Sequence, residues 1–145
     1  MKVTGLHHVL LTVRDLERST AFYTEVLGLR KVKEIPDNGT AGAKVLCGLP
    51  DGRLLGLVQH RANGGGVFDE FRTGLDHVAL TVPADELDLW SRRLDDAGID
   101  HSPPAPSAFG DPLIVLRDPD EIQLQIYGTR SDQGPDGAGP TSRDD

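Results

Sequence analysis

The chain has few of the features that mark secreted, membrane-spanning or zinc-binding proteins. Its 145 residues contain one cysteine, Cys47, which excludes an intramolecular disulfide and a cysteine-rich zinc site. No apolar run approaches the roughly 20 residues needed to span a bilayer. Polar residues and Gly5 interrupt the N-terminal stretch too early for a signal peptide. We therefore expect a soluble, cytoplasmic protein.

Positive charge is also scarce. The chain has 15 Lys and Arg against 23 Asp and Glu, a formal net charge of -8. A surface this acidic repels phosphate backbones and anionic lipid headgroups. The composition thus predicts neither a nucleic-acid partner nor a membrane partner, and it leaves a small molecule as the expected ligand.

Apolar residues make up only 37% of the chain, and seven residues are aromatic. Part of this deficit is local, because residues 128–145 contain no apolar residue larger than alanine. Such a segment cannot bury enough surface to offset the entropy lost on ordering. We expect a disordered tail over 128–145 and a single folded domain over 1–127, which is long enough for one core.

The folded part contains an internal repeat. Residues 4–13 read TGLHHVLLTV and residues 73–82 read TGLDHVALTV, identical at eight of ten positions at an offset of 69. Between the copies, residues 61–71 include Asn63-Gly64-Gly65-Gly66, which is typical of a linker. The repeat predicts two modules, at about 2–60 and 72–127.

Each module shows the same order of elements, which predicts an α+β fold. A strand rich in β-branched and apolar residues opens it, at 6–13 and at 75–82. A helix follows, from an Asp15 N-cap to Gly28 in the first copy, and through Leu87, Trp90 and Leu94 to Gly98 in the second. Trp90 is expected in the core. Further strands are expected at 42–46, 53–59, 113–116 and 122–127, with a turn over 118–121.

Alternation along the strands sorts their side chains onto two faces. Leu124 and Ile126 belong to the face that packs on the helix, whereas Gln125 faces a cleft. His8 and His77 occupy equivalent positions on the face away from the helix, and two imidazoles on rigid strands make half a metal site. The alternative is a structural histidine copied by duplication. The other histidines are expected at the rim or in solvent: His7, His60 and His101.

Several of these segments resemble the vicinal oxygen chelate superfamily, which includes glyoxalase I, fosfomycin-resistance thiol transferases, extradiol dioxygenases and bleomycin-resistance proteins. The resemblance covers residues 2–127 and implies two tandem βαβββ modules forming a curled mixed sheet around a cleft. It also implies a homodimer, with the cleft built within one chain or across two. The segments that carry it are Leu6-His7-His8-Val9, Asp15 to Tyr23, Val26-Leu27-Gly28-Leu29, Leu75-Asp76-His77-Val78-Ala79 and Arg117-Asp118-Pro119-Asp120.

The resemblance also implies a divalent metal ion (Zn, Ni, Co, Mn or Fe) with His8 and His77 as ligands. The third ligand of the family is a glutamate, and here that position is Gln125; the position of a fourth ligand is Gly56. An amide can bind a metal through oxygen, but it is neutral and cannot act as a proton base. Glyoxalase-type proton shuttling and two-histidine-one-carboxylate iron chemistry both require a carboxylate at this third-ligand position. Gln125 could instead hydrogen-bond a ligand without any metal.

Two functions are therefore expected from the sequence. The first is a glyoxalase-like, metal-dependent enzyme, of lyase, isomerase or dioxygenase-like type, that acts on a small substrate with neighbouring oxygens; no catalytic base is identified. The alternative is a non-catalytic protein that binds a small, antibiotic-type molecule, as bleomycin-resistance proteins do. The residues expected to line the ligand pocket are Leu10, Leu54, Gly56, Val58, Phe109, Gln123 and Tyr127.

Overall fold

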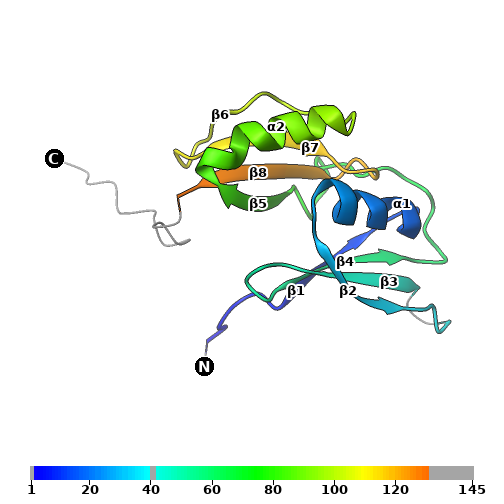
Figure 1. Cartoon of the computed structure of the whole chain (residues 1–145). Helices are drawn as coiled ribbons and strands as arrows, with labels where there is room; N and C mark the ends of the chain where they lie inside the picture. The colour runs from blue at the N-terminus through cyan, green and yellow to red at the C-terminus, as the bar shows by residue number, and fades with distance from the viewer. Residues whose placement is uncertain (1, 40–41, 131–145) are drawn as a thin grey trace. The chain divides into compact units, whose positions relative to one another are not determined.

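The computed structural model describes residues 2–39 and 42–130 (Figure 1). The chain divides into two compact units, which correspond to the two modules of the repeat. One unit is Met1–Asp69 with Asp118–Ile122, and the other is Glu70–Arg117 with Gln123–Asp145. The segment Asp118–Ile122 therefore groups with the first unit, although the repeat assigns it to the second module.

The first unit has the strand–helix–strands order expected from the sequence. Its elements are β1 (His8–Thr12), α1 (Leu16–Ala21), the π-helical turn η1 (Phe22–Val26), β2 (Arg30–Ile35), β3 (Ala43–Gly48) and β4 (Leu54–Gln59). The sheet order is β1-β4-β3-β2, with β1 parallel to β4 and the other pairs antiparallel.

The second unit repeats this topology. Its elements are β5 (Val78–Pro83), the 3-10 turn η2 (Ala84–Glu86), α2 (Leu87–Asp96), β6 (Ala105–Pro106), β7 (Pro112–Arg117) and β8 (Gln123–Thr129). The order is β5-β8-β7-β6, again with one parallel pair, β5 and β8. The expected α+β fold of two βαβββ modules is confirmed, each module forming a four-stranded mixed sheet.

The capping residues fix where the first helix begins and ends. The Asp15 side chain accepts a hydrogen bond from the backbone N–H of Arg18, which satisfies one free donor at the start of α1. After η1 the chain reverses at Gly28, whose φ of 73° lies in the left-handed region that glycine adopts most readily. Both ends agree with the sequence prediction.

The core of each unit lies between its helix and one face of its sheet. In β8 the side chains of Leu124 and Ile126 are buried, whereas Gln123, Gln125 and Tyr127 are half-buried on the other face. In β1, Leu11 is buried and its neighbours are not. The alternation read from the sequence is therefore confirmed on both strands.

Other expectations about single residues need correction. The His101 side chain was expected in solvent but is only 8% exposed; its Nδ1 is 2.8 Å from the carbonyl oxygen of Ser102, and Nε2 is 3.3 Å from Asp95 Oδ1. His7 and His60 are exposed, as expected. Trp90 is half-buried rather than enclosed in the core, and the Arg93 guanidinium lies 5.4 Å from its ring centroid.

The ends of the expected domain also differ in detail. Strand β8 continues through Gly128 and Thr129, two residues into the segment expected to be disordered. The rest of that expected tail, from residue 131, lies outside the described residues. Residues 61–71 form no helix or strand, and their role as a linker stays a prediction. In the part of the chain that the structure describes, no helix is long and apolar enough to cross a membrane.

Candidate functional site

The two units differ in one row of three paired residues, which crosses neighbouring strands on the sheet face away from the helix. In the first unit, Leu10, Gly56 and Leu46 are paired side by side on β1, β4 and β3. A Cβ added at Gly56 would lie 2.2 Å from Leu10 Cδ2 and 2.8 Å from Leu46 Cδ2. The two leucine side chains therefore fill the space above Gly56. A metal-binding side chain at position 56 would fit only if these leucines moved.

In the equivalent row of the second unit, the large side chain is in the middle and smaller ones flank it. Ala79, Gln125 and Val115 are paired on β5, β8 and β7. The small Ala79 is exposed, and the half-buried Gln125 side chain stands on the same face as Gln123 and Tyr127. The second unit thus presents an amide where the first presents leucines. The ligand-binding role of Gln125 stays a prediction.

His77 lies directly before β5, the strand that pairs with β8, and β8 carries Gln125. Its Nδ1 is 2.5 Å from Asp76 Oδ1, so Nδ1–H donates to that carboxylate, because an ionised carboxylate only accepts. The side chain is 35% exposed, and among the described residues no hydrogen bond reaches Nε2. A histidine with Nδ1–H held by a carboxylate and a bare Nε2 has the tautomer and orientation of a metal ligand.

His8 opens β1 in the first unit and is exposed. Its Nδ1 lies 2.8 Å from the Nδ1 of His7, with the two rings edge to face at a centroid distance of 5.0 Å. One ring therefore donates to the other, and the contact leaves Nε2 of His8 without a partner among the described residues. His8, like His77, retains a ring nitrogen able to bind a metal.

The donor set suits a divalent ion but carries no negative charge. Two imidazole nitrogens and an amide oxygen are acceptable ligands for Zn, Fe, Co, Ni or Mn. Within residues 2–39 and 42–130, however, no three or more His, Cys, Asp or Glu side chains are grouped so that they could hold a metal. By their chemistry alone, His8 of the first unit and His77 and Gln125 of the second could each serve as a neutral ligand of a divalent ion.

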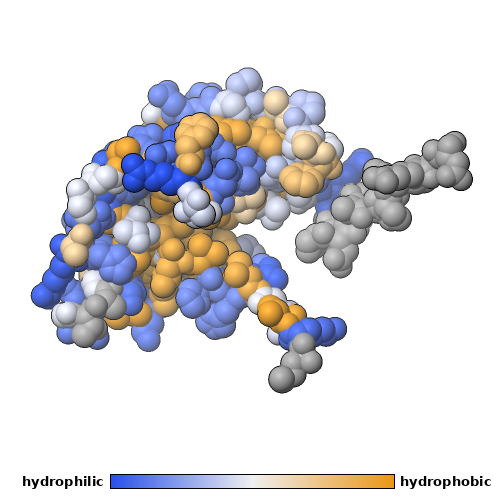
Figure 2. Space-filling model, turned by 180° about the vertical axis from the view of Figure 1, so that it is seen from behind, coloured by the Kyte–Doolittle hydropathy of each residue, from blue (hydrophilic) through white to orange (hydrophobic). Residues whose placement is uncertain are grey.

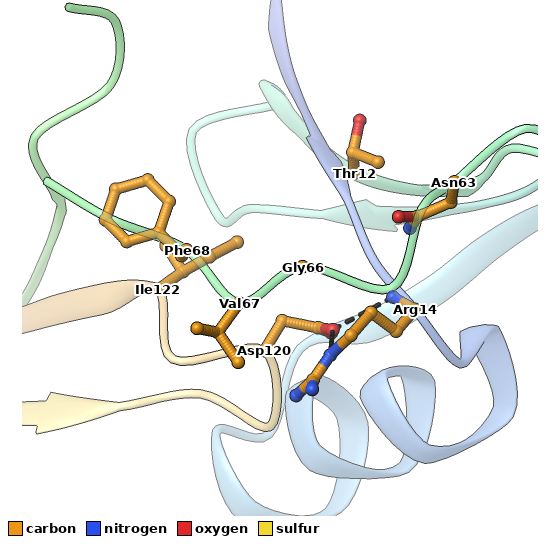
Figure 3. A pocket seen from close by; sticks show the side chains of 8 residues that line it. All are labelled: Thr12, Arg14, Asn63, Gly66, Val67, Phe68, Asp120 and Ile122. Atoms are coloured by element: carbon orange, nitrogen blue, oxygen red, sulfur yellow. Dashed lines mark hydrogen bonds and ion pairs between the residues drawn. The ribbon is translucent and has the colours of Figure 1, made fainter. Parts of the chain in front are cut away.

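The first unit also contains a cavity of about 120 Å³ (Figure 3). It is lined by Thr12, Arg14, Asn63, Gly66, Val67, Phe68, Asp120 and Ile122. None of the residues that the sequence assigned to the ligand pocket is among them. Sites for drug-sized ligands occupy about 300–1,000 Å³, so this cavity is too small for a ligand of that size.

A polar cluster beside this cavity was not found from the sequence. Asp120 accepts hydrogen bonds from the backbone N–H and Nε of Arg14, each at 2.9 Å (Figure 3). It also accepts one from the Ser19 hydroxyl at 2.8 Å. The Tyr23 hydroxyl donates to Asp118 at 2.9 Å. The spacing of Ser19 and Tyr23, one helical turn apart, was the only local signal. Their partners lie about 100 residues away.

Burial dominates the electrostatics of this cluster. Asp118 is only 3% exposed, and burial raises the pKa of its carboxyl group against the hydrogen bonds that lower it. Burial also raises the pKa of Tyr23, which keeps the phenol protonated, with the nearby Asp118 charge acting in the same direction. Every carboxylate oxygen of the cluster receives a hydrogen bond, so the arrangement stabilises the fold rather than supplying a reactive group.

The predicted pocket residues of the first unit differ in accessibility. Leu10 is 41% exposed, Leu54 is half-buried, and Gly56 and Val58 are buried, Val58 at 3%. Val3 and Leu6 are also exposed, and Figure 2 shows apolar surface along the N-terminal segment. In the second unit, Phe109 is 83% exposed, and its ring centroid lies 6.4 Å from that of Tyr127.

Known proteins share the sequence pattern and the fold of this chain. Residues 5–126 match the family model of the glyoxalase/bleomycin resistance protein/dioxygenase superfamily. The chain is 31% identical over 146 residues to the proposed ring-cleaving dioxygenase MhqE of Bacillus subtilis (strain 168), covering 94% of this chain but 46% of MhqE. It thus spans about half the length of this relative.

Solved structures give the same fold. A glyoxylase/bleomycin resistance protein/dioxygenase domain from Frankia sp. EAN1pec has a TM-score of 0.78 at 34% identity, covering 89% of this chain and 100% of the other. A glutamate-to-glutamine variant of the fosfomycin resistance protein FosX from Listeria monocytogenes, in complex with Mn(II) and 1S,2S-dihydroxypropylphosphonic acid, has a TM-score of 0.67. Its sequence identity is 18%, over 90% of this chain and 96% of FosX.

Proposed function

Because the chain belongs to the glyoxalase/bleomycin resistance protein/dioxygenase superfamily, we propose that it is a metal-dependent enzyme acting on a small substrate with two neighbouring oxygens. His8, His77 and Gln125 supply the metal ligands in this proposal. The observation that carries it is the state of His77, whose Nδ1–H is held by Asp76 while Nε2 is left bare. His101, by contrast, has a contact at each ring nitrogen, with the Ser102 carbonyl and with Asp95.

Each residue of this set has its own task. Asp76 orients the His77 ring and makes its Nε2 more basic, and therefore a stronger metal ligand. Gln125 offers its amide oxygen to the ion, and its NH₂ group remains available to donate to a substrate oxygen. When bound, a divalent ion held only by neutral ligands supplies strong polarisation of the two substrate oxygens.

The same ligands limit the proton chemistry that the chain can perform. The outward face of β8 presents Gln123, Gln125 and Tyr127, with no carboxylate among them. An amide cannot shuttle a proton between carbons as a glutamate does. The reaction class therefore stays open between lyase, isomerase and dioxygenase-like chemistry. The relatives support substrates with neighbouring oxygens, since they include a catechol-2,3-dioxygenase, 30% identical over 131 residues, and FosX with a bound diol.

Metal binding by untagged protein tests the proposal. We expect close to one equivalent of a divalent ion by elemental analysis, or after titration with Mn, Fe, Co, Ni or Zn followed by calorimetry. His8→Ala and His77→Ala should each lower the metal affinity at least tenfold. Gln125→Glu should raise it, because it adds the missing negative charge, whereas the matched control Gln123→Glu, two residues earlier on the same face, should not.

The metal proposal fails if the protein holds less than about 0.1 equivalents and gains none on titration. Equal effects of Gln125→Glu and Gln123→Glu would contradict the assignment of Gln125 as a ligand, since a general increase in negative charge would then explain both.

The second candidate is a non-catalytic binding protein, and the neutral donor set favours it. Binding needs no base, so the lack of a carboxylate on the β8 face is no obstacle to it. Saturable small-molecule binding without turnover or bound metal would identify this function. The homodimer and the cytoplasmic location remain predictions, of which light scattering in solution tests the first.

A further inference from the structure

Phe109 is an exposed aromatic side chain on an ordered loop. The loop between β6 and β7 closes through hydrogen bonds from Ser107 N to Asp111 O and from Gly110 N to Ser107 O, at 3.1 and 3.2 Å. The backbone N–H of Phe109 donates to the Ser107 hydroxyl at 3.1 Å. The ring is nevertheless 83% exposed. The loop therefore holds a large apolar group in water, and burying it would be favourable.

The ring of Tyr127 lies near that of Phe109, at a centroid distance of 6.4 Å and an interplanar angle of 53°. Phe109 thus lies next to the β8 face that carries Gln125, two residues before Tyr127. Two residues of a strand span about 7 Å, which is close to the length of an oxygenated benzene ring. A planar ligand with its oxygens beside Gln125 would reach the two aromatic rings with its other end.

We propose that Phe109 and Tyr127 form an aromatic platform that binds the planar, apolar ring of the ligand and so selects aromatic over aliphatic substrates. The position of the ligand's oxygens at His77 and Gln125 rests on the proposed function, whereas the platform itself needs only the two rings. Tilted and edge-to-face ring pairs are favoured at centroid distances of about 4.5–7 Å, so the contact between Phe109 and Tyr127 is itself favourable and holds the two rings side by side.

The platform is tested by calorimetric titration of the Mn(II)-treated and the untreated protein under anaerobic conditions, so that the ring is not oxidised. The probes are catechol, which has a ring and two neighbouring oxygens, and propane-1,2-diol, which has the oxygens alone. We expect catechol to bind at least tenfold more tightly. Phe109→Ala should lower catechol affinity by about tenfold and leave propane-1,2-diol affinity unchanged, and Phe109→Tyr should restore catechol binding.

Phe71→Ala is the matched control, because Phe71 is 94% exposed in the segment between the two modules. It should change the affinity of neither probe. Phe109→Ala should remain folded, since an 83% exposed ring contributes little to the core, and a circular dichroism spectrum checks this.

The outcomes separate the platform from the metal site. Equal affinities for both probes, insensitive to Phe109→Ala but dependent on Mn(II), would overturn the platform and leave the proposed function standing. Catechol binding that depends on Phe109 but not on Mn(II) would support the platform and contradict the metal proposal. Absence of catechol binding at millimolar concentration, or a change of oligomeric state in Phe109→Ala in place of a change in affinity, would overturn the platform.

Discussion

Two turns at equivalent places in the repeat have the same backbone and opposite surroundings. Leu49–Arg53 is closed by hydrogen bonds from Leu49 N to Arg53 O and from Gly52 N to Leu49 O, at 2.9 and 3.0 Å. The turn 118–122, offset by 69, has the same two bonds, each at 3.0 Å. Each also has one left-handed residue at the same place, Gly52 with φ of 84° and Glu121 with φ of 68°.

The side chains of the two turns differ. Asp51 of the first turn is exposed and binds only its neighbour Arg53. Its counterpart Asp120 is 5% exposed and binds Arg14 and Ser19, while Asp118, whose counterpart is Leu49, binds Tyr23. Local sequence thus specifies the turn, and the partners brought by tertiary structure decide whether a carboxylate in it stabilises the protein.

The largest effect is expected from removing the buried carboxylate. Asp120→Ala leaves the backbone N–H and Nε of Arg14 and the Ser19 hydroxyl without their acceptor, while Arg14 Nη2 keeps its hydrogen bond to the Pro119 carbonyl. The change should lower the free energy of unfolding by about 3–5 kcal/mol. The equivalent Asp51→Ala removes an exposed ion pair and should leave stability unchanged within error. Urea unfolding followed by circular dichroism measures both, and equal losses would show that the two turns are energetically alike.

A smaller effect is expected from Tyr23→Phe. Tyr23 is fully buried, and its hydroxyl donates to Asp118 Oδ2 at 2.9 Å. Removing it leaves a buried carboxylate oxygen unpaired, at a cost of about 2 kcal/mol. Tyr127→Phe is the control, because Tyr127 is half-buried, and it should change stability by less than about 0.5 kcal/mol. A neutral Tyr23→Phe would mean that Asp118 is not held by this bond.

The pH dependence of stability distinguishes Asp118 from the exposed carboxylates. Burial raises its pKa in the folded state, so its stabilising contribution is complete below the ordinary value of 3.8 and is lost as pH rises through the raised pKa. The amide that replaces it in Asp118→Asn does not titrate. Relative to the unmodified protein, this variant should therefore gain about 1.4 kcal/mol for each unit of pKa elevation as pH rises from below 3.8 to neutral. Unfolding at several pH values measures it, and a constant difference would contradict the raised pKa.

The smallest effect concerns the left-handed position shared by the turns. Glu121→Gly should stabilise the protein by at most about 1 kcal/mol, because glycine adopts this φ without steric cost. Gly52→Ala should destabilise it by about 1 kcal/mol through backbone strain alone, since nothing lies within 4 Å of the added Cβ. Thermal unfolding compares the two, and the same sign for both changes would show that φ does not control them.

Much of the fold could be predicted because its signals are local. The repeat at an offset of 69, the alternation in β8 and the Asp15 cap each depend on near neighbours. Strand β2 was not located, because its sequence RKVKEI is mostly charged and mostly exposed. The two-residue β6 was missed because so short a strand carries no periodicity. His101 was misjudged, since its burial depends on Asp95 and Ser102.

The candidate site was predictable in part. Equivalent positions in the repeat identified His8 and His77, and the family resemblance identified Gln125. The leucines above Gly56 and the hydrogen bond from His77 to Asp76 became visible only in three dimensions. Side-chain direction and free volume depend on which residues share a row across strands. Register sets those rows, and the sequence of one strand does not contain it.

By itself the sequence determined the two-module α+β fold, the order of its main elements, the face on which the residues of β1 and β8 lie, and the neutral side chain at position 125. The tertiary structure alone decided which carboxylates are buried, how His77 is oriented, and that one row is filled by leucines while its counterpart presents an amide. The physical reason is range. Periodicity, caps and turns act over a few residues, whereas burial, pKa and packing depend on residues as far apart as Ser19 and Asp120.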